Sequence, residues 1–143
     1  MKNLIIICDI DGTIALRGDR SPHDHDASME DAVNKPIVNI VNAMIDAVEI
    51  DDLILVSGRD EKYRDVTEYW LETHRVFNSP NYSYLFMRPR GDNRPDEVVK
   101  REIYEQKIKD KYDVLCVFDD RNKVVKMWRD LGLTCLQVAE GDF

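Results

Sequence analysis

The sequence predicts an α/β fold, namely a doubly wound, mainly parallel five-stranded sheet with helices on both faces. Five short apolar runs of strand length recur along the 143 residues, and stretches of helical character alternate with them. Polar or charged side chains that could take part in binding or catalysis follow four of these runs. That placement is typical of parallel sheets, whose ligands bind beyond the carboxyl ends of the strands.

The first predicted strand covers residues 4–8, a continuous apolar run such as a strand buried on both faces requires. Residues 15–35 are polar and rich in Asp, His, Ser and Arg, and they predict a loop or small flap. His23 and His25 alternate with acids in this flap. A spacing of two on a loop is a weak metal signal, so we interpret both histidines as solvated, with a second metal as the alternative.

The first predicted helix begins near Pro36, because proline suits the first turn of a helix. Its apolar stripe consists of Ile37, Val38, Ile40, Val41, Met44, Ile45 and Val48. The second predicted strand covers residues 53–56 and runs into Ser57-Gly58-Arg59. A helix over residues 63–75 follows, and we expect its inward face to carry Val66, Tyr69 and Trp70, with Thr73 as a further candidate.

The third predicted strand, residues 84–87, leads into a basic loop over residues 88–94. A helix then begins at Pro95 and extends to about Ile108. Acids fill its first turn, where the helix dipole favours negative charge.

The fourth predicted strand, residues 114–118, is followed at once by Asp119 and Asp120. The next helix ends at Gly132, a plausible C-cap, and residues 133–138 form the last predicted strand. The predicted topology therefore gathers side chains that are distant in sequence at one edge of the sheet.

Composition narrows the range of functions. The chain is 43% hydrophobic and 34% charged, which is typical of one soluble globular domain. A net charge of −8 argues against non-specific binding of long nucleic-acid duplexes, which usually needs a basic surface. The apolar start is too short for a signal peptide or membrane span, so we expect a cytoplasmic protein without membrane contact. Reduced, buried thiols are then expected for Cys8, Cys116 and Cys135.

The segment Asp9-Ile10-Asp11-Gly12-Thr13 carries the strongest chemical signal. In an extended chain, a spacing of two could put both carboxylates on one side, and Gly12 permits a sharp exit. One carboxylate, Asp9, can attack phosphorus, and Asp11 can act as general acid and base. A solvated turn is the alternative, but the position directly after an apolar strand disfavours it.

Phosphate and metal ligands are predicted at the ends of the other strands. Ser57 and nearby backbone N–H groups can bind phosphate oxygens, and Lys100 can neutralise a phosphoryl group. A plain turn and a surface lysine are the respective alternatives. Asp119 and Asp120 are adjacent acids without an evident cation, so they predict a Mg²⁺ site, with a helix N-cap as the alternative.

These motifs together resemble the haloacid dehalogenase-like phosphohydrolase superfamily. Over nearly the whole chain the sequence resembles one branch, the 3′-phosphatase domain of phage-type polynucleotide kinase–phosphatase. The resemblance is carried by DIDGTIA (9–15), RSPHD (20–24), ILVSGR (54–59), MRPRGDNRPDEVVK (87–100), FDDRNKVVKMWRDLGL (118–133) and QVAEGDF (137–143). It implies a HAD-like, Rossmannoid phosphatase domain over residues 1–143 with a minimal flap.

The resemblance implies a Mg²⁺-dependent enzyme that removes a 3′-terminal phosphate from DNA or RNA through an aspartyl-phosphate intermediate. Opening of 2′,3′-cyclic phosphates is a further activity of the family. The implied catalytic residues are Asp9, Asp11, Ser57 and Lys100. The implied metal site comprises Asp9, the backbone near Asp11, Asp119 and Asp120. The implied substrate-binding residues are Thr13, Ser57, Gly58, Arg59, Arg88 and Arg94.

The sequence also departs from that family. It contains no GxxxxGK[ST] motif and has no room for a kinase domain, so no 5′-kinase activity is expected. The stretch after Arg59 is short, which puts substrate contacts there in question. A small-molecule nucleotidase, a non-catalytic phosphate-binding subunit and a receiver domain remain as alternatives. The sequence fixes neither the choice between DNA and RNA nor the oligomeric state, for which a homodimer is one option.

Overall fold

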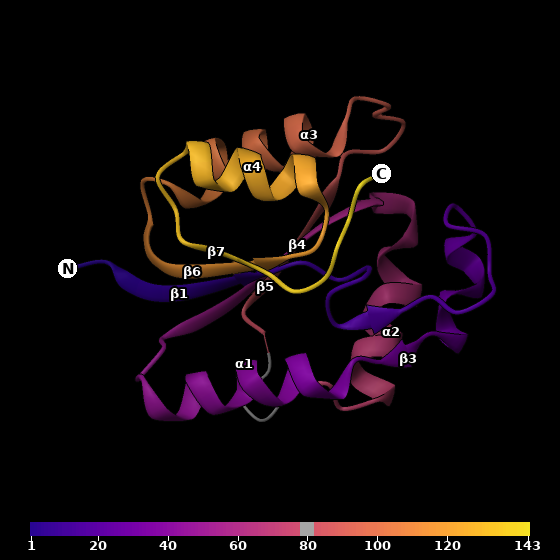
Figure 1. Cartoon of the computed structure of the whole chain (residues 1–143), viewed down its shortest axis with the longest axis horizontal. Helices are drawn as coiled ribbons and strands as arrows, with labels where there is room; N and C mark the ends of the chain where they lie inside the picture. Colours follow the sequence, from indigo (N-terminus) through magenta and orange to yellow (C-terminus); the bar gives the residue numbers. More distant parts are fainter. Residues whose placement is uncertain (78–81) are drawn as a thin grey trace.

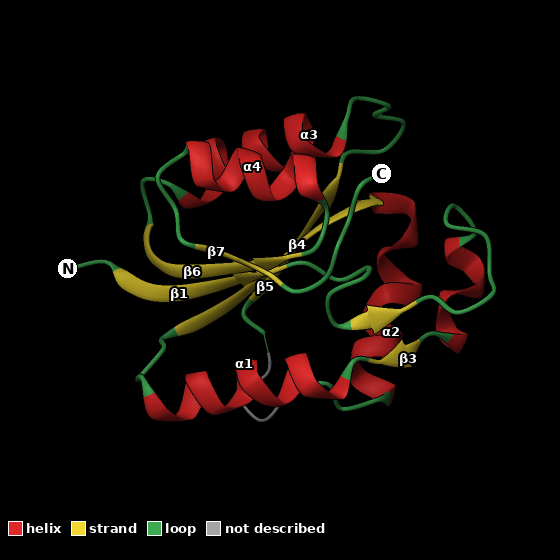
Figure 2. Ribbon diagram, viewed as in Figure 1, coloured by secondary structure: helices red, strands yellow, loops and turns green. Residues whose placement is uncertain are grey.

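The computed structural model of the protein describes residues 1–77 and 82–143 and has three layers (Figures 1 and 2). Helices α3 (Asp96–Ile103) and α4 (Asn122–Asp130) cover one face of a central sheet. Helix α1 (Lys35–Ala47) covers the other face, and α2 (Arg64–Thr73) lies on the same side next to the flap. The predicted α/β fold with helices on both faces is therefore confirmed.

All neighbouring strands of the sheet are parallel, and their order is β5-β4-β1-β6-β7. The strands are β1 (Asn3–Cys8), β4 (Asp52–Asp60), β5 (Tyr84–Arg88), β6 (Tyr112–Asp119) and β7 (Cys135–Gln137). From β1 the chain first adds β4 and β5 on one side of this strand, and it then adds β6 and β7 on the other side. The carboxyl end of β1 is thus the topological switch point, where ligands bind in open α/β sheets.

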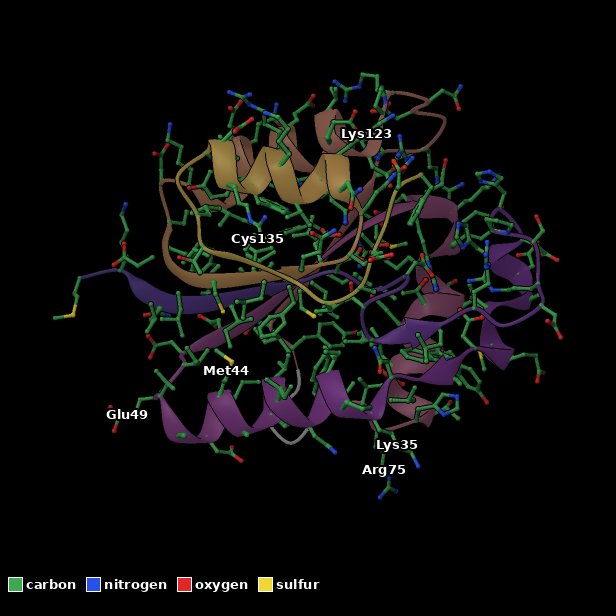
Figure 3. All side chains as sticks on the ribbon, viewed as in Figure 1. Lys35, Met44, Glu49, Arg75, Lys123 and Cys135 are labelled. Carbon is green, nitrogen blue, oxygen red and sulfur yellow. The ribbon has the colours of Figure 1, made fainter. Side chains whose placement is uncertain are left out.

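Strand β1 is apolar from Leu4 to Cys8, and both faces of this part of the strand are covered. Ile6 and Cys8 belong to the core under α1 and α2, whereas Ile5 and Ile7 belong to the core under α3 and α4. Side chains fill both spaces between the sheet and its helices, as Figure 3 shows around the labelled Met44 and Cys135. All three cysteines are buried and free, as predicted.

Strand β4 is longer than predicted and carries two extra residues against its neighbour. Ser57 pairs with Met87 and Asp60 pairs with Arg88, so Gly58 and Arg59 have no partner on β5. Such an irregularity bends the strand locally and redirects its side chains. The result is that Arg59 points toward the flap instead of lying in the regular ladder, as its contacts show.

The flap contains more regular structure than the sequence predicted. The short strands β2 (Ala15–Leu16) and β3 (Ala32–Val33) pair antiparallel, and a 3₁₀ helix, η1 (His25–Glu30), lies between them. In Figure 1 this flap packs beside α2 at one end of the molecule. Trp70 of α2 ties it down, since its indole N–H donates to the Asp31 carbonyl at 2.9 Å.

Two predicted helix faces differ from the observed ones. The inward face of α2 carries Thr67, Trp70 and Leu71, whereas Tyr69 is 59% exposed, so its predicted inward position is wrong. A 3₁₀ turn, η2 (Glu61–Tyr63), precedes α2, and the helix turns toward the flap as well as the sheet. The predicted α1 stripe is too wide, because Ile40 and Val48 are exposed.

The helix predicted to end near residue 108 changes its winding on the way. Helix α3 ends at Ile103 and continues as a π-helical turn, η3 (Tyr104–Ile108). No helix within the described residues is long and apolar enough to span a bilayer.

Candidate active site

Asp9 directly follows β1 and is held firmly by the residues around it. Its backbone N–H donates to the Phe118 carbonyl at 2.9 Å, which places it beside the end of β6. One carboxylate oxygen accepts from Lys100 Nζ at 2.8 Å and the other from Thr13 Oγ1 at 2.9 Å. The Thr13 hydroxyl therefore positions Asp9, and this is the contact through which it can serve the site.

The tight turn after the aspartates depends on Gly12. Its backbone has a φ of +80°, a conformation that residues with a side chain rarely adopt. A Cβ atom at this position would lie only 2.1 Å from Oδ2 of Asp120. Glycine thus allows the loop after β1 to approach the acids that follow β6.

Lys100 is the buried cation of the site. It comes from α3, is 2% exposed, and bridges Asp9 at 2.8 Å and Asp119 at 3.0 Å. Burial alone would lower the pKa of this ammonium, but Asp119 and Asp9 outweigh burial and raise it above its ordinary value. Lys100 is consequently charged and ties the ends of β1 and β6 together.

Three buried carboxylates, those of Asp9, Asp119 and Asp120, meet at this edge of the sheet. Each offers a ligand oxygen, and these oxygens lie within 4.8 Å of one another. Asp119 also accepts from the Trp128 indole at 3.2 Å and from the Asp120 backbone N–H at 2.9 Å. The sequence prediction that these acids converge is thus matched by the geometry.

The charges of this cluster fit a divalent cation. Three carboxylates and one ammonium leave an excess of two negative charges if all are ionised, among the groups named here. Burial and then the Asp119 carboxylate raise the pKa of Asp9 well above its usual range, although Lys100 opposes them. The same two causes raise the pKa of Asp120. Carboxylate oxygens are the ligands that Mg²⁺ prefers, and its charge would offset this repulsion.

Asp11 occupies a different environment, although it lies only two residues from Asp9. Its carboxylate forms a two-point ion pair with Arg59, at 2.8 and 2.7 Å, and contacts Arg20 at 3.4 Å. Burial alone would raise the pKa of Asp11, but Arg59 above all lowers it below its ordinary value. Asp11 is therefore ionised here and faces the flap.

Arg59, predicted as a substrate ligand, is 2% exposed and serves as the link between Asp11 and the flap. Besides Asp11 it donates to Thr67 Oγ1 of α2 at 2.9 Å and to Ser28 Oγ of η1 at 3.4 Å. Arg20, which sequence reasoning did not assign to the site, completes the link through a two-point bond to Asp31 at 2.7 and 2.8 Å. Its only sequence signal was its place in the RSPHD segment.

Ser57 and Gly58 form the turn at the end of the regular β4 ladder. Ser57 is fully buried, and its Oγ accepts from the Arg59 N–H at 3.1 Å. A Cβ on Gly58 would lie 2.7 Å from a carboxylate oxygen of Asp96, so this turn sits directly against the start of α3. Gly58 is thus next to the first turn of the helix that carries Lys100.

Asp96 organises the cations next to this turn. Its carboxylate pairs with Arg88 and accepts from Arg121 Nη1 at 2.8 Å. Arg88 also donates to the Gly58 carbonyl at 2.8 Å. Sequence reasoning read Asp96 only as a residue favoured by the helix dipole and overlooked Arg121, because nothing local reveals their partners.

The basic loop is partly neutralised by its own acids. Arg94 is exposed and pairs with Asp92 at 2.6 Å and Glu102 at 2.5 Å. Arg90, by contrast, makes no ion pair or hydrogen bond with the described residues. Asp60 anchors the loop, since its carboxylate accepts from the Gly91 N–H at 2.9 Å and from the Lys62 N–H at 2.8 Å.

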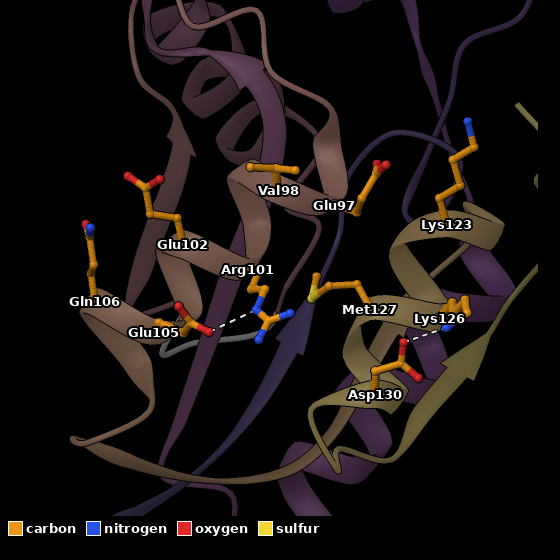
Figure 4. A pocket seen from close by; sticks show the side chains of 10 residues that line it. All are labelled: Glu97, Val98, Arg101, Glu102, Glu105, Gln106, Lys123, Lys126, Met127 and Asp130. Carbon is orange, nitrogen blue, oxygen red and sulfur yellow. Dashed lines mark hydrogen bonds and ion pairs between the residues drawn. The ribbon is translucent and has the colours of Figure 1, made fainter.

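A surface groove between α3 and α4 is separate from this site (Figure 4). Val98 and Met127 form part of its wall, and the ion pairs Arg101–Glu105 and Lys126–Asp130 lie along it. None of the catalytic or metal-binding residues predicted from the sequence lines it.

The fold and the site are those typical of haloacid dehalogenase-type phosphatases. They combine this strand order, two aspartates after the central strand, a buried lysine from α3 and paired aspartates at the end of β6. Within that class the chain belongs to the polynucleotide kinase PNKP phosphatase domain family, whose model matches residues 3–143. The resemblance noted in the sequence is thereby confirmed.

Known relatives agree with this assignment. The chain is 35% identical over 130 residues to a viral protein of Autographa californica nuclear polyhedrosis virus, which bears the provisional name of bifunctional polynucleotide kinase/RNA ligase. This match covers 90% of the chain and 18% of that protein. Two solved structures are 38% identical and match 99% of the chain, with TM-scores of 0.91 and 0.89.

The first of these structures is a Pnkp1/Rnl/Hen1 complex, and the second is described as the Pnkp1/Rnl/Hen1 RNA repair complex. The chain spans 48% and 44% of the matched chains, so it corresponds to about half of each.

Proposed function

We propose that the protein is a Mg²⁺-dependent phosphatase that removes the 3′-terminal phosphate from DNA or RNA. The observation that carries the proposal is the position of Asp9, held between Thr13 and Lys100 and beside the carboxylates of Asp119 and Asp120. The fixed carboxylate is oriented for attack, and an adjacent cation would stabilise charge on the phosphoryl group. Bound Mg²⁺ would supply that positive charge.

The reaction has two steps, the formation of an aspartyl phosphate and its hydrolysis. An oxygen of Asp9 bonds to phosphorus while the bond to the nucleoside O3′ breaks, and Asp11 gives its proton to that departing oxygen. Water then attacks the phosphorus of the aspartyl phosphate and gives a proton to Asp11, which releases phosphate and restores Asp9. Lys100 stays charged throughout and holds Asp9 in line.

The ion pair of Asp11 with Arg59 favours the ionised form of this carboxyl group. An ionised Asp11 is prepared to accept a proton from water, whereas the first step needs the protonated acid. A substrate phosphate that binds Arg59 and Arg20 would compete with Asp11 for both arginines. Loss of these contacts, of which those with Arg59 count most, would raise the pKa of Asp11 and favour the acid form that the first step uses.

A nucleic-acid end as substrate is supported by the family and by the names of the relatives. The basic loop adds a physical reason, because Arg90 is unpaired among the described residues and available to a phosphate of the strand. The occurrence of the solved relatives in complexes with Rnl and Hen1 suggests a comparable assembly for this protein.

A substrate panel tests the proposal. We expect a 3′-phosphorylated oligonucleotide to be hydrolysed much faster than a nucleoside 5′-monophosphate, and the rate to vanish in a chelator and return with Mg²⁺. Equal rates on both substrates would indicate a small-molecule nucleotidase, and undiminished activity without metal would refute the metal role.

Covalent catalysis needs its own measurement. With a ³²P-labelled 3′-phosphate and an acid quench, the wild type should retain label on the protein and Asp9→Asn should not. Activity should fall by several orders of magnitude in that variant. Near-normal turnover by Asp9→Asn would exclude Asp9 as the nucleophile.

A further inference from the structure

Two aromatic rings and a lysine meet where the flap joins the start of α2. His25 begins η1, and Tyr63 ends η2; their ring centroids are 5.1 Å apart and the rings are inclined at 64°. Lys62 places its ammonium 5.0 Å from the centroid of the Tyr63 ring. The mechanism above uses none of these three side chains.

This ring pair lies on the Asp11 side of the site. Arg59, which binds Asp11, is also held by Ser28 of η1 and Thr67 of α2, the elements that flank the two rings. His25 is near enough to Asp11 for charge to matter: burial lowers the pKa of the imidazole, and the Asp11 carboxylate opposes this shift. The rings are thus neighbours of the proposed general acid.

The chemistry of the reaction fixes where the nucleoside must lie. Asp11 can protonate the leaving oxygen only within hydrogen-bond reach, so the sugar and base attached to that oxygen occupy the Asp11 side. Asp119, Asp120 and Lys100 gather instead around Asp9. The terminal nucleoside therefore faces the flap and the ring pair.

Tyr63 is partly accessible to solvent, and the rest of its surface packs against the core under α1 and α2. Lys62 is exposed, and its flexible chain reaches the ring, while Tyr63 and His25 are only half-buried. A flat base can take the place of the ammonium, because nucleobases stack on aromatic side chains. The displaced lysine would remain close enough to contact a backbone phosphate.

His25 has a feature that points to a ligand as well. Its Nδ1 atom is buried and has no hydrogen-bond partner among the described residues. A buried polar atom without a partner costs free energy, so packing alone does not explain a histidine at this place. A ligand that reaches this nitrogen would supply the missing partner.

We propose that His25, Tyr63 and Lys62 form a stacking subsite for the 3′-terminal nucleobase of the substrate. The inference rests on the proposed 3′-phosphatase function and adds how the nucleoside is recognised. Because every base presents a flat π face, the subsite recognises the presence of a base and not its identity. It takes an unpaired 3′ end, since a base in a duplex is already stacked and paired.

Two substrates that differ in one base test this subsite. One is a 3′-phosphorylated single-stranded oligonucleotide, and the other is the same strand with an abasic terminal residue. Stacking is worth about 1–3 kcal/mol per base, so Tyr63→Ala should lower kcat/KM on the complete substrate by about 5- to 150-fold. The same variant should change the rate on the abasic substrate much less. His25→Ala should act in the same direction.

Two further variants serve as controls. Tyr63→Phe keeps the ring and should restore most of the base-dependent rate. Tyr69→Ala removes a tyrosine of α2 that is 59% exposed and should leave both substrates unaffected. Thermal unfolding of each variant identifies a loss that arises from misfolding.

A binding assay gives a readout independent of turnover. In the Asp9→Asn background, a 3′-terminal 2-aminopurine should be quenched on binding, and adding Tyr63→Ala should abolish the quenching. Equal losses on the base-bearing and abasic substrates, or unchanged quenching, would overturn the subsite while leaving the 3′-phosphatase intact. Absence of 3′-phosphatase activity in the wild type, with an aryl phosphate still hydrolysed, would overturn both proposals.

Discussion

Replacing Lys100 by methionine tests the electrostatic balance of the site. Lys100 is 2% exposed and is the cation that bridges Asp9 and Asp119. A methionine side chain has most of the volume and length of the lysine side chain but carries no charge. Without metal, the substitution leaves three buried carboxylates together without this cation.

The expected loss is large because burial prevents water from screening these charges. Removing one partner of a buried ion pair typically costs about 3–5 kcal/mol. For 143 residues with an unfolding entropy of about 2.1 cal/mol/K per residue, this corresponds to a decrease in Tm of about 10–17 °C. Protonation of one carboxyl relieves the repulsion, so the loss should be smaller at acidic pH.

Urea titrations in a chelator and in Mg²⁺ measure this effect. A bound cation stabilises the folded state by about 2.7 kcal/mol at a hundredfold excess over its Kd, and Mg²⁺ should recover part of the loss in Lys100→Met. The matched control is Lys126→Met, which removes a lysine of α4 from an exposed pair with Asp130. That change should cost no more than about 0.5 kcal/mol.

A double variant separates charge from packing. Asp9→Asn combined with Lys100→Met should be more stable than the sum of the single losses predicts, by about 0.5–3 kcal/mol, because the repulsion is then reduced. Strict additivity, or a Lys100→Met loss below about 1 kcal/mol in chelator, would refute the electrostatic account. Lys100 would then be an ordinary packed side chain.

Three other predictions follow from particular contacts. Gly12→Ala should lower kcat/KM about 100-fold or more, since its Cβ would meet Asp120 at 2.1 Å. Gly18→Ala, at a similar φ but with nothing within 4 Å, is the control; equal losses would implicate strain alone. Burial alone would raise the pKa of Asp96, but Lys100, Arg121 and Arg88 lower it below 3.8. The Asp96 carboxylate thus stabilises the folded state above pH 3.8, and this effect is lost as the pH falls through its lowered pKa. In urea titrations, Asp96→Asn should lower the free energy of unfolding by about 2 kcal/mol at pH 7 and by less near pH 3. A cost that does not depend on pH would contradict this. Arg90→Ala should lower the turnover of an oligonucleotide. It should also reduce the slope of its salt dependence by about the amount that one phosphate contact contributes. An equal loss on a mononucleotide would place Arg90 in the phosphate pocket instead.

Sequence patterns predicted the convergence of Asp9, Lys100, Asp119 and Asp120 because parallel strands align their carboxyl ends. Asp9 directly follows β1, and Asp119 is the last residue of the neighbouring β6, so a correct assignment of the strands is enough to bring them together. Lys100 reaches them because α3 packs on that face of the sheet. The topology of the sheet alone was sufficient for this prediction, and no knowledge of side-chain conformation was needed.

The arginines show where such reasoning stops. Arg59 is 48 residues from Asp11 in the chain, and Arg88 is eight from Asp96, so neither pairing follows a helical or strand period. Their direction depends on the two extra residues of β4, which no local pattern indicates. Tyr69 was misplaced for a related reason, since α2 packs against a flap as well as the sheet.

Asp60 gives the protein a single attachment point for two loops with different tasks. Its carboxylate receives backbone N–H groups from Lys62, next to the ring pair, and from Gly91, next to Arg90. The strand that leads to Asp60 is largely buried, whereas Lys62 and Gly91, whose backbone N–H groups bind this carboxylate, are exposed. New preferences for nucleic-acid ends could therefore evolve by substitutions at residues 61–63 and 89–94 around this one acid, while the proposed catalytic residues stay unchanged.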